Sequence, residues 1–304
     1  GTMSCDDGSW TPAINASTGE VTGTPTGADI GVCTISVDAV SGVDTINQVF
    51  TIYIYPSPTA FTFTGDTDSD WHTASNWFGN AVPTSGDVAL FSGRCGVSCT
   101  ATFAAPVAAA GVDLGPSFAG TVTQGTGQTI TVGTSGFLQE NGSFVGANAN
   151  ITITGVLTLT GGSFLSTSSV LELRNSPASN ITQFTVTPDQ SFAHNNGTLK
   201  LWSAGSCGPN AVTIDVDSTL DLFNLVTERT VSCSRYSTYT VAAGDVLNIL
   251  GDITQGPSSI LAGAFELKGN YIISSQAQFG LGTVTVNGTT DQTYSFDSGF
   301  GSAR

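Results

Sequence analysis

The chain has 304 residues, of which 39% are apolar and only 10% are charged, and its 23 acidic and 7 basic side chains give a net charge of −16. This apolar content predicts a folded protein, while the shortage of basic residues excludes the large basic patch that nucleic acid or an anionic membrane requires. No apolar run reaches the roughly 20 residues of a membrane span, and the opening Gly1-Thr2-Met3 is typical of a cloned piece of a longer protein.

Residues 1–57 are predicted to form one β-structured unit. A turn-rich segment at 18–26 precedes a strand at 33–37, and a second strand at 49–55 is ended by prolines, which cannot donate to a sheet ladder. The stretch STGEVTGTPTGADIGVCTISVDA…QVFTIYIYP, within residues 17–56, resembles the immunoglobulin-like (cadherin-like) repeat of bacterial surface proteins. The family module is longer at its N-terminus, so the resemblance implies a partial sandwich.

Residues 58–99 are predicted to be a linker followed by a cap. The block contains Trp71, Asn76-Trp77, Gly79, Pro83 and the segment 87–91, and it resembles the block that opens β-helical regions in autotransporter-like and other large bacterial surface proteins. Two large aromatic side chains are suited to cover the open end of a solenoid, whose first coil otherwise exposes apolar surface to water.

Residues 100–304 repeat one short pattern. The segments 141–145 (NGSFV) and 161–165 (GGSFL) align 20 residues apart. An apolar–polar–apolar strand recurs with intervals of 21, 20, 28, 21, 27, 18 and 19 residues, beginning at Ile130, Ile151, Leu171, Leu199, Leu220, Leu247, Phe265 and Val284. Repeats of this length predict stacked coils, in which the first and third residues of each strand face a shared core.

The predicted fold is therefore all-β: a right-handed parallel β-helix preceded by a partial immunoglobulin-like sandwich. The right hand is expected from the chirality of strand–crossover–strand connections and from the resemblance. The alternative is a large antiparallel sandwich or jelly roll, but its hairpins usually repeat every 8–12 residues or so, which is shorter than the interval seen here.

Six cysteines favour disulfides over a zinc site, because only two of them are closely spaced and the chain has only two histidines. Proximity in the sequence suggests the pairs Cys5–Cys33, Cys95–Cys99 and Cys207–Cys233. Three disulfides predict an oxidising compartment outside the cytoplasm.

Asp66, Asp68 and Asp70 stand at alternate positions, a spacing that suits the oxygen ligands of Ca²⁺. An EF-hand is excluded, because Trp71 and Trp77 occupy the positions of its glycine and its bidentate glutamate. A looser calcium turn and a solvated acidic linker both remain open.

Asp215, Asp217 and the nearby Asp221 are the best candidates for the paired carboxylates of a glycoside hydrolase. The alternative is an ordinary strand whose polar residues point to solvent between core residues. Lyase chemistry on acidic sugars would need a basic residue near the substrate, and the candidates are isolated: Arg174, Lys200, Arg229 and Arg235. Neither His72 nor His194 belongs to a recognisable nucleophilic triad. We expect no enzyme activity.

Trp202, Tyr236 and Tyr239 flank the loop bracketed by Cys207 and Cys233, and exposed aromatic side chains there would suit a sugar or a protein. The alternative is that they fill the core. With the resemblances, these features predict an extracellular, adhesin-like surface or fibre protein that binds a host or prey cell glycan or protein, without a cofactor. A polysaccharide hydrolase or lyase and a passive spacer are the alternatives, and homo-oligomerisation is open.

Overall fold

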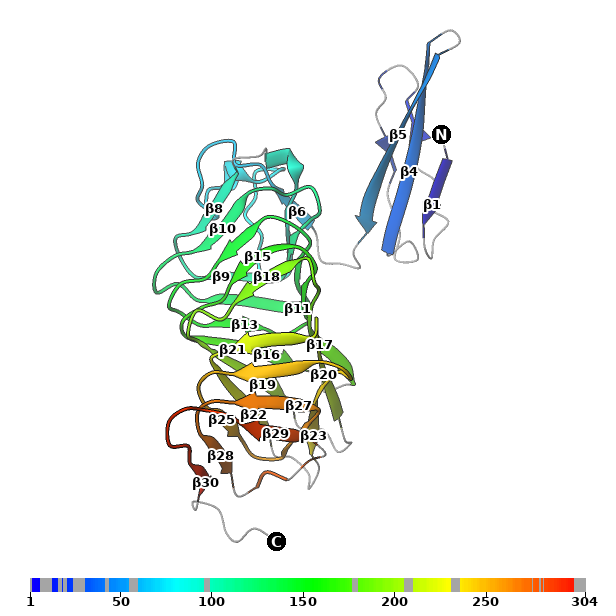
Figure 1. Ribbon diagram of the computed structural model, residues 1–304. Coiled ribbons are helices and arrows are strands. Elements are labelled where there is room, and N and C mark those ends of the chain that lie inside the picture. Colours follow the sequence, from blue (N-terminus) through cyan, green and yellow to red (C-terminus); the bar gives the residue numbers. More distant parts are fainter. Residues whose placement is uncertain are drawn as a thin grey trace. The chain divides into compact units, whose positions relative to one another are not determined.

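The chain divides into two compact units, Gly1–Ala60 and Phe61–Arg304, in the computed structural model (Figure 1). The residues that the structure describes are 2–5, 13–15, 18, 21–23, 31–41, 44–54, 60–95, 99–176, 180–204, 210–230, 236–274, 276–278, 280 and 282–297. Among them, the helices are two one-turn 3-10 helices, η1 (Ala74–Asn76) and η2 (Gly93–Cys95), so the all-β prediction is confirmed.

The described strands of the first unit pair in antiparallel fashion. β1 (Thr2–Cys5), β4 (Gly31–Ser41) and β5 (Asp44–Ile54) form one sheet in the order β1-β4-β5, and β2 (Ala13–Ile14) pairs with β3 (Val21–Thr22). β4 contains the predicted strand at 33–37, and β5 contains most of the one at 49–55. A three-stranded sheet and a two-stranded ribbon do not amount to a sandwich, so the immunoglobulin-like module stays a prediction.

The second unit is a parallel β-solenoid of about nine turns, as the repeat length predicts (Figure 1). Its coils contribute strands to three faces. The first face consists, in stacking order, of residues 107–109 of β9 (Val107–Leu114), residues 130–132 of β11 (Ile130–Gln139), β13 (Ile151–Ile153), β16 (Val170–Asn175), β19 (Thr198–Ser203), β22 (Asn224–Arg229), β25 (Ile253–Gln255), β28 (Tyr271–Ser274) and β30 (Tyr294–Asp297).

The other two faces follow the same coils. The second face consists of β7 (Val88–Phe91), the later residues of β9 and β11, β14 (Leu157–Leu159), β17 (Ile181–Val186), β20 (Asn210–Val216), β23 (Ser237–Val241) and β26 (Ser259–Ala262), with β6 (Ala60–Phe63) paired to β7. The third face has two separate ladders: β8 (Thr100–Phe103), β10 (Thr121–Gln124), β12 (Ser143–Val145), β15 (Gly162–Leu165) and β18 (Gln190–Ala193), then β21 (Thr219–Leu222), β24 (Val246–Ile249), β27 (Ala264–Leu267) and β29 (Thr283–Val286).

The register of the strands confirms the repeat but corrects its alignment. Ile130, Ile151, Leu171 and Leu199 stack on one another along the first face, as predicted. The predicted next member, Leu220, instead begins a stack on the third face, and Leu199 pairs with Leu225. All three faces use the same apolar–polar–apolar strand, so the pattern alone does not reveal which face a strand joins.

Period-2 alternation fills the core of the solenoid with one apolar side chain at every second position. Phe144, Phe164 and Phe192 occupy equivalent positions of β12, β15 and β18, and their rings stack with centroids 4.8 and 5.9 Å apart. The predicted alignment of segments 141–145 and 161–165 is thus confirmed. Each phenylalanine needs its neighbours above and below to exclude water, so one coil has no core of its own.

Side chains at the corner between the third and first faces link successive coils. The side-chain oxygen of Asn224 accepts from the Asp252 backbone nitrogen (2.8 Å), and Asp252 Oδ1 accepts from the Asn270 backbone nitrogen (2.7 Å). Asn270 Oδ1 then accepts from the backbone nitrogen of Thr293 (3.0 Å). Side chains of the preceding coil thus satisfy backbone donors at this turn.

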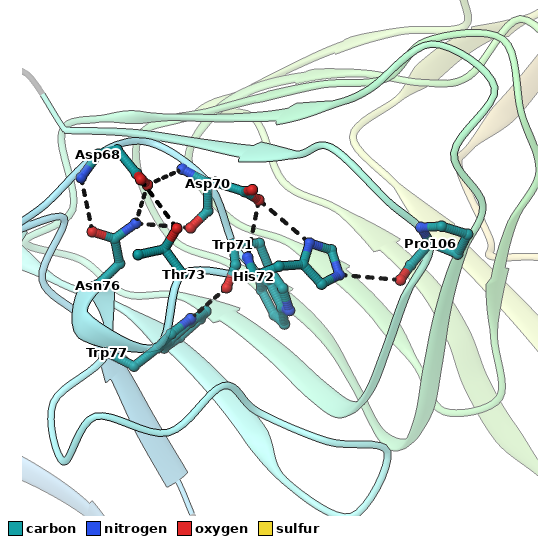
Figure 2. Close-up of polar contacts among 8 residues, drawn as sticks. All are labelled: Asp68, Asp70, Trp71, His72, Thr73, Asn76, Trp77 and Pro106. Carbon is teal, nitrogen blue, oxygen red and sulfur yellow. Dashed lines mark hydrogen bonds and ion pairs between the residues drawn. The ribbon is translucent and has the colours of Figure 1, made fainter.

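The tryptophan-containing block covers the first coil. The Trp71 backbone nitrogen donates to Thr102 O and the Thr102 nitrogen donates to Ser69 O, so this segment protects the outer edge of β8. Trp71 and Trp77 are 1% exposed. Their rings meet edge to face at 4.6 Å, Trp71 meets Phe103 at 4.8 Å, and Trp77 Nε1 donates to Trp71 O (Figure 2).

Candidate functional site

β16, β19 and β22 carry a cluster of charged and aromatic side chains on the outer surface of the first face. Strand register places Glu172 beside Lys200, Arg174 beside Trp202, and Trp202 beside Glu228. The residues that alternate with them point into the core: Leu171, Leu173, Leu199, Leu201, Leu225 and Thr227. The five charged and aromatic side chains therefore face outward, together with Val226 of β22. We call these five residues the Trp202 patch.

The four charges of the Trp202 patch are paired with one another. Lys200 Nζ lies 3.2 Å from Glu172 Oε1 and 3.0 Å from Glu228 Oε2, so it bridges two carboxylates. Arg174 contacts Glu172 Oε2 at 2.8 Å through its Nη2 atom, and its guanidinium lies 5.4 Å from the centre of the Trp202 ring. The Glu172 side chain is only 11% exposed, because its two basic partners cover it.

The electrostatics of Lys200 are governed by this network. Partial burial lowers the pKa of its ammonium group, but hydrogen bonds and Coulombic attraction from Glu228 and Glu172 outweigh burial, and the pKa is raised above its usual value. Lys200 therefore keeps its charge throughout the physiological pH range. The patch is a fixed arrangement of two cations and two anions around one indole ring.

The patch lies where the coils of the solenoid are longest. Along the first face, Leu171, Leu199, Leu225 and Ile253 are stacked partners separated by 28, 26 and 28 residues, whereas Ile130, Ile151 and Leu171 are separated by 21 and 20. Extra residues follow β16, β19 and β22, in the segments 176–180, 204–209 and 230–236. Insertions repeated at one corner of a solenoid frequently mark its binding face.

The three aromatic residues proposed to bind a ligand differ in how deeply they are buried. Trp202 is half-buried on the outer surface, as binding requires, and Tyr236 is also half-buried. Tyr239 is fully buried, and its hydroxyl donates to the backbone oxygen of Glu228. The prediction for Tyr239 is wrong, because Ser237, Tyr239 and Val241 are the inward positions of β23. Burial also raises the pKa of the Tyr239 hydroxyl.

The acidic residues considered for catalysis are spread over two faces. Asp215 is exposed on β20 of the second face, between the buried residues Ile214 and Val216. Asp217 lies in the turn after that strand, and Asp221 is on β21 of the third face, where its carboxylate accepts from Asn248 Nδ2 at 2.8 Å. These carboxylates occupy outward positions, as the ordinary-strand alternative predicts.

The basic and histidine candidates are likewise dispersed. Arg174 and Lys200 belong to the Trp202 patch, Arg229 is buried at 1% exposure, and Arg235 lies outside the described residues. The ring of His194 stacks on Phe223 with centroids 5.8 Å apart, and its Nδ1 accepts from the Asn196 backbone nitrogen. His72 holds the cap turn: its Nδ1 lies 3.3 Å from Asp70 Oδ1 and its Nε2 lies 3.4 Å from Pro106 O (Figure 2).

The contacts of the cap do not bring the three aspartates of the predicted calcium turn together. Asp68 Oδ1 accepts from the Asp70 backbone nitrogen (2.8 Å) and from Asn76 Nδ2 (2.6 Å), while its Oδ2 accepts from Thr73 Oγ1 (Figure 2). The hydrogen bond from the Asp70 backbone, followed by that from Asn76, lowers the pKa of Asp68. Asp70 turns toward His72, and Asp66 is exposed. Within the described ranges, no three His, Cys, Asp or Glu side chains converge to hold a metal ion.

The predicted disulfides are described in part. Cys95 and Cys99 are joined, with their Cα atoms 5.3 Å apart. Cys5 and Cys33 stand opposite each other in the register of β1 and β4. Cys207 and Cys233 lie outside the described residues, so their pairing stays a prediction. The strands that flank the two cysteines are paired: Ser203 of β19 lies beside Arg229 of β22, and Asn210 of β20 lies beside Ser237 of β23.

Comparisons of the chain with protein-family models, with curated proteins and with solved structures find no match. In the part of the chain that the structure describes, no helix has the length and apolar character that a membrane crossing requires. Among the described residues, the Trp202 patch is the arrangement whose chemistry best fits a ligand.

Proposed function

We propose that this chain is a non-catalytic, extracellular surface protein of the adhesin-like kind, whose solenoid is a stalk that holds a ligand-binding face. In this proposal the Trp202 patch is that face, the coil is right-handed, and the first unit is a partial immunoglobulin-like module. The observation that carries the proposal is the coincidence of a paired-charge network around one outward tryptophan with three successive long coils.

A binding role fits the chemistry of the patch better than a catalytic one. A general acid or base needs a carboxyl group whose proton can be exchanged with the substrate. Glu172 and Glu228 are instead each held by Lys200, and Glu172 also by Arg174. Such a network fixes side-chain positions before a ligand arrives, which reduces the ordering cost of binding.

An extracellular location is supported by the Cys95–Cys99 disulfide and by the acidic composition, because disulfides persist in oxidising compartments and a high net charge favours solubility. The extracellular placement and the adhesin role also rest on the resemblances in residues 17–56 and 66–91. The stalk role is supported by the solenoid, whose stacked coils extend along one direction.

The proposal is tested with the fluorescently labelled 304-residue chain on panels of bacterial and animal cells and on immobilised glycans. We expect saturable binding that falls at least about tenfold in Trp202→Ala, since truncating a central aromatic side chain of a binding face costs about 2 kcal/mol or more. Phe78→Ala is the matched control, because Phe78 is an exposed aromatic residue (59%) of the cap, distant in sequence from the patch. Circular dichroism checks that both variants fold.

Equal binding by the wild type and Trp202→Ala on every surface would contradict the proposed binding face. A complete lack of binding would favour the passive spacer instead. Loss of binding in both Trp202→Ala and Phe78→Ala would also count against the patch, since the contact would then not be local to it.

A further inference from the structure

The charges of the Trp202 patch point to the chemical class of its ligand. We infer that the patch binds a neutral glycan, which stacks on Trp202 and forms hydrogen bonds with the paired charges around it. This inference rests on the proposed function, because it specifies the ligand of the same face. It is carried by the charge balance, the geometry and the size of the patch.

Charge balance disfavours both anionic and cationic ligands. Glu172 and Glu228 cancel Arg174 and Lys200, so the patch has no net charge, and each charged group already has a partner between 2.8 and 3.2 Å away. An anionic ligand at Lys200 or Arg174 would be repelled by Glu172 and Glu228 as much as it is attracted, so it gains no net Coulombic attraction from the patch. The chain as a whole, at −16, also repels anionic polymers.

A neutral sugar can bind to these groups without breaking the ion pairs. Carboxylate oxygens accept additional hydrogen bonds from sugar hydroxyls, and Lys200 and Arg174 have several donors each. Hydrogen bonds to charged groups are the stronger kind. The half-buried indole of Trp202 offers an apolar surface between them, which suits the C–H face of a pyranose ring.

The dimensions of the patch favour a small ligand over a folded protein. Neighbouring strands lie about 4.8 Å apart and alternate residues of a strand about 6.6 Å apart, so the patch on its three strands covers roughly 10 by 7 Å. This matches one or two sugar rings. A stable protein–protein interface buries about 800 Å² on each partner, far more than this area.

The test is a titration of the full chain with neutral, anionic and cationic oligosaccharides, in which binding is measured by tryptophan fluorescence and by calorimetry. The probes are cello-, malto-, xylo- and chito-oligosaccharides as neutral ligands, oligogalacturonate and sialyllactose as anions, and chitosan oligosaccharides as cations. We expect at least one neutral series to bind, with an affinity that falls at least tenfold or so in Trp202→Ala and is unchanged in Phe78→Ala. Salt should change that affinity less than about twofold, because no net charge is neutralised.

A second variant tests the charge argument in the opposite direction. Glu228→Gln removes one of the two carboxylates beside Lys200 and leaves the patch with a net positive charge. We expect this variant to gain measurable, salt-sensitive binding of oligogalacturonate, which the wild type lacks. No gain of anion binding would contradict the argument from charge balance.

Three outcomes overturn the inference and differ in what they imply for the proposed function. Trp202-dependent binding of an anionic or cationic oligosaccharide alone would leave a binding face but reject a neutral ligand. Trp202-dependent cell binding that protease treatment of the cells abolishes, with no oligosaccharide bound, would identify a protein partner. If no ligand or cell shows Trp202-dependent binding, both the inference and the proposed function fail.

Discussion

At the scale of single residues, buried polar groups hold the cap of the solenoid together. Asn76 is fully buried, and its Oδ1 accepts from the backbone nitrogen of Thr67. Its Oδ1 also accepts from the Asp68 backbone nitrogen, and its Nδ2 donates to Asp68 Oδ1 and Asp70 O (Figure 2). One amide side chain therefore uses both its donor and its acceptor capacity to fix the turn that carries Trp71.

We expect Asn76→Ala to lower the free energy of unfolding by about 2–4 kcal/mol, because it removes four part-buried hydrogen bonds of a fully buried side chain at once. Ser75→Ala is the matched control. Ser75 is exposed and shares a single hydroxyl contact with Thr67 (2.7 Å), so its removal should cost less than about 0.5 kcal/mol. Chemical denaturation measures both, and similar costs would show that the Asn76 contacts do not hold the cap.

Glu140 is expected to destabilise the fold when it is ionised. Desolvation, followed by repulsion from Asp113, raises the pKa of Glu140 above its usual value. The contribution of such a group to stability is fully present below its unfolded pKa and is lost as the pH rises through its folded pKa. Glu140→Gln should therefore be more stable than the wild type at pH 7, by about 0.5 kcal/mol after allowance for solvent screening.

The gain from Glu140→Gln should vanish below about pH 4, where the wild-type carboxyl is protonated in both states. Asp291→Asn provides the control, because Asp291 is exposed and the substitution removes the same charge. Denaturation curves at several pH values compare the two. A gain for Glu140→Gln that persists at low pH, or an equal gain for Asp291→Asn, would show that local burial is not the cause.

At the scale of elements, glycines at the corners set how closely coils can stack. A Cβ atom on Gly161 would lie 2.2 Å from the carbonyl oxygen of Glu140 in the preceding coil. Gly244 is different: its φ is +100°, but a Cβ there would meet no atom within 4 Å. A substitution at Gly161 therefore tests the steric contact between coils, whereas a substitution at Gly244 tests backbone strain alone.

We expect Gly161→Ala to destabilise the solenoid by about 2–4 kcal/mol, because neighbouring backbones must move apart. Gly244→Ala should cost only about 1 kcal/mol, the usual penalty for a left-handed alanine. Thermal unfolding followed by circular dichroism gives both values. If Gly161→Ala is no worse than Gly244→Ala, close contact between coils at this corner is not what requires glycine.

The sequence predicted the solenoid because its coils stack on apolar residues at short, regular intervals, and Ile130, Ile151 and Leu171 do so. It did not predict the change of face at Leu220, because three faces share one strand pattern. Two of the five residues of the Trp202 patch could be placed from the sequence, since the aligned trios at Leu171 and Leu199 already put Glu172 beside Lys200. The position of Glu228 in the patch could not be predicted, because its strand begins with the polar residue Asn224 and the coil before it is longer than the early ones.

At the scale of the whole molecule, the parallel solenoid explains how insertions are accommodated without loss of the fold. Each coil contacts the coil above and the coil below, so stability is close to a sum over neighbours. Extra residues after β16, β19 and β22 leave the register of the first face intact from Leu171 to Ile253. Binding residues are commonly found beside long loops on a regular scaffold.

Site-specific photo-crosslinking shows whether the ligand binds across β16, β19 and β22 on the first face when the chain is bound to cells or glycans. Val226 is an outward, half-buried residue of β22 paired with Lys200, and Thr123 is a comparable outward residue of β10 on the third face. With a photoreactive side chain at one or the other position, we expect crosslinks to the ligand from position 226 and none above background from position 123. Crosslinks from position 123 alone, or equal yields from both positions, would show that the Trp202 patch is not the binding face.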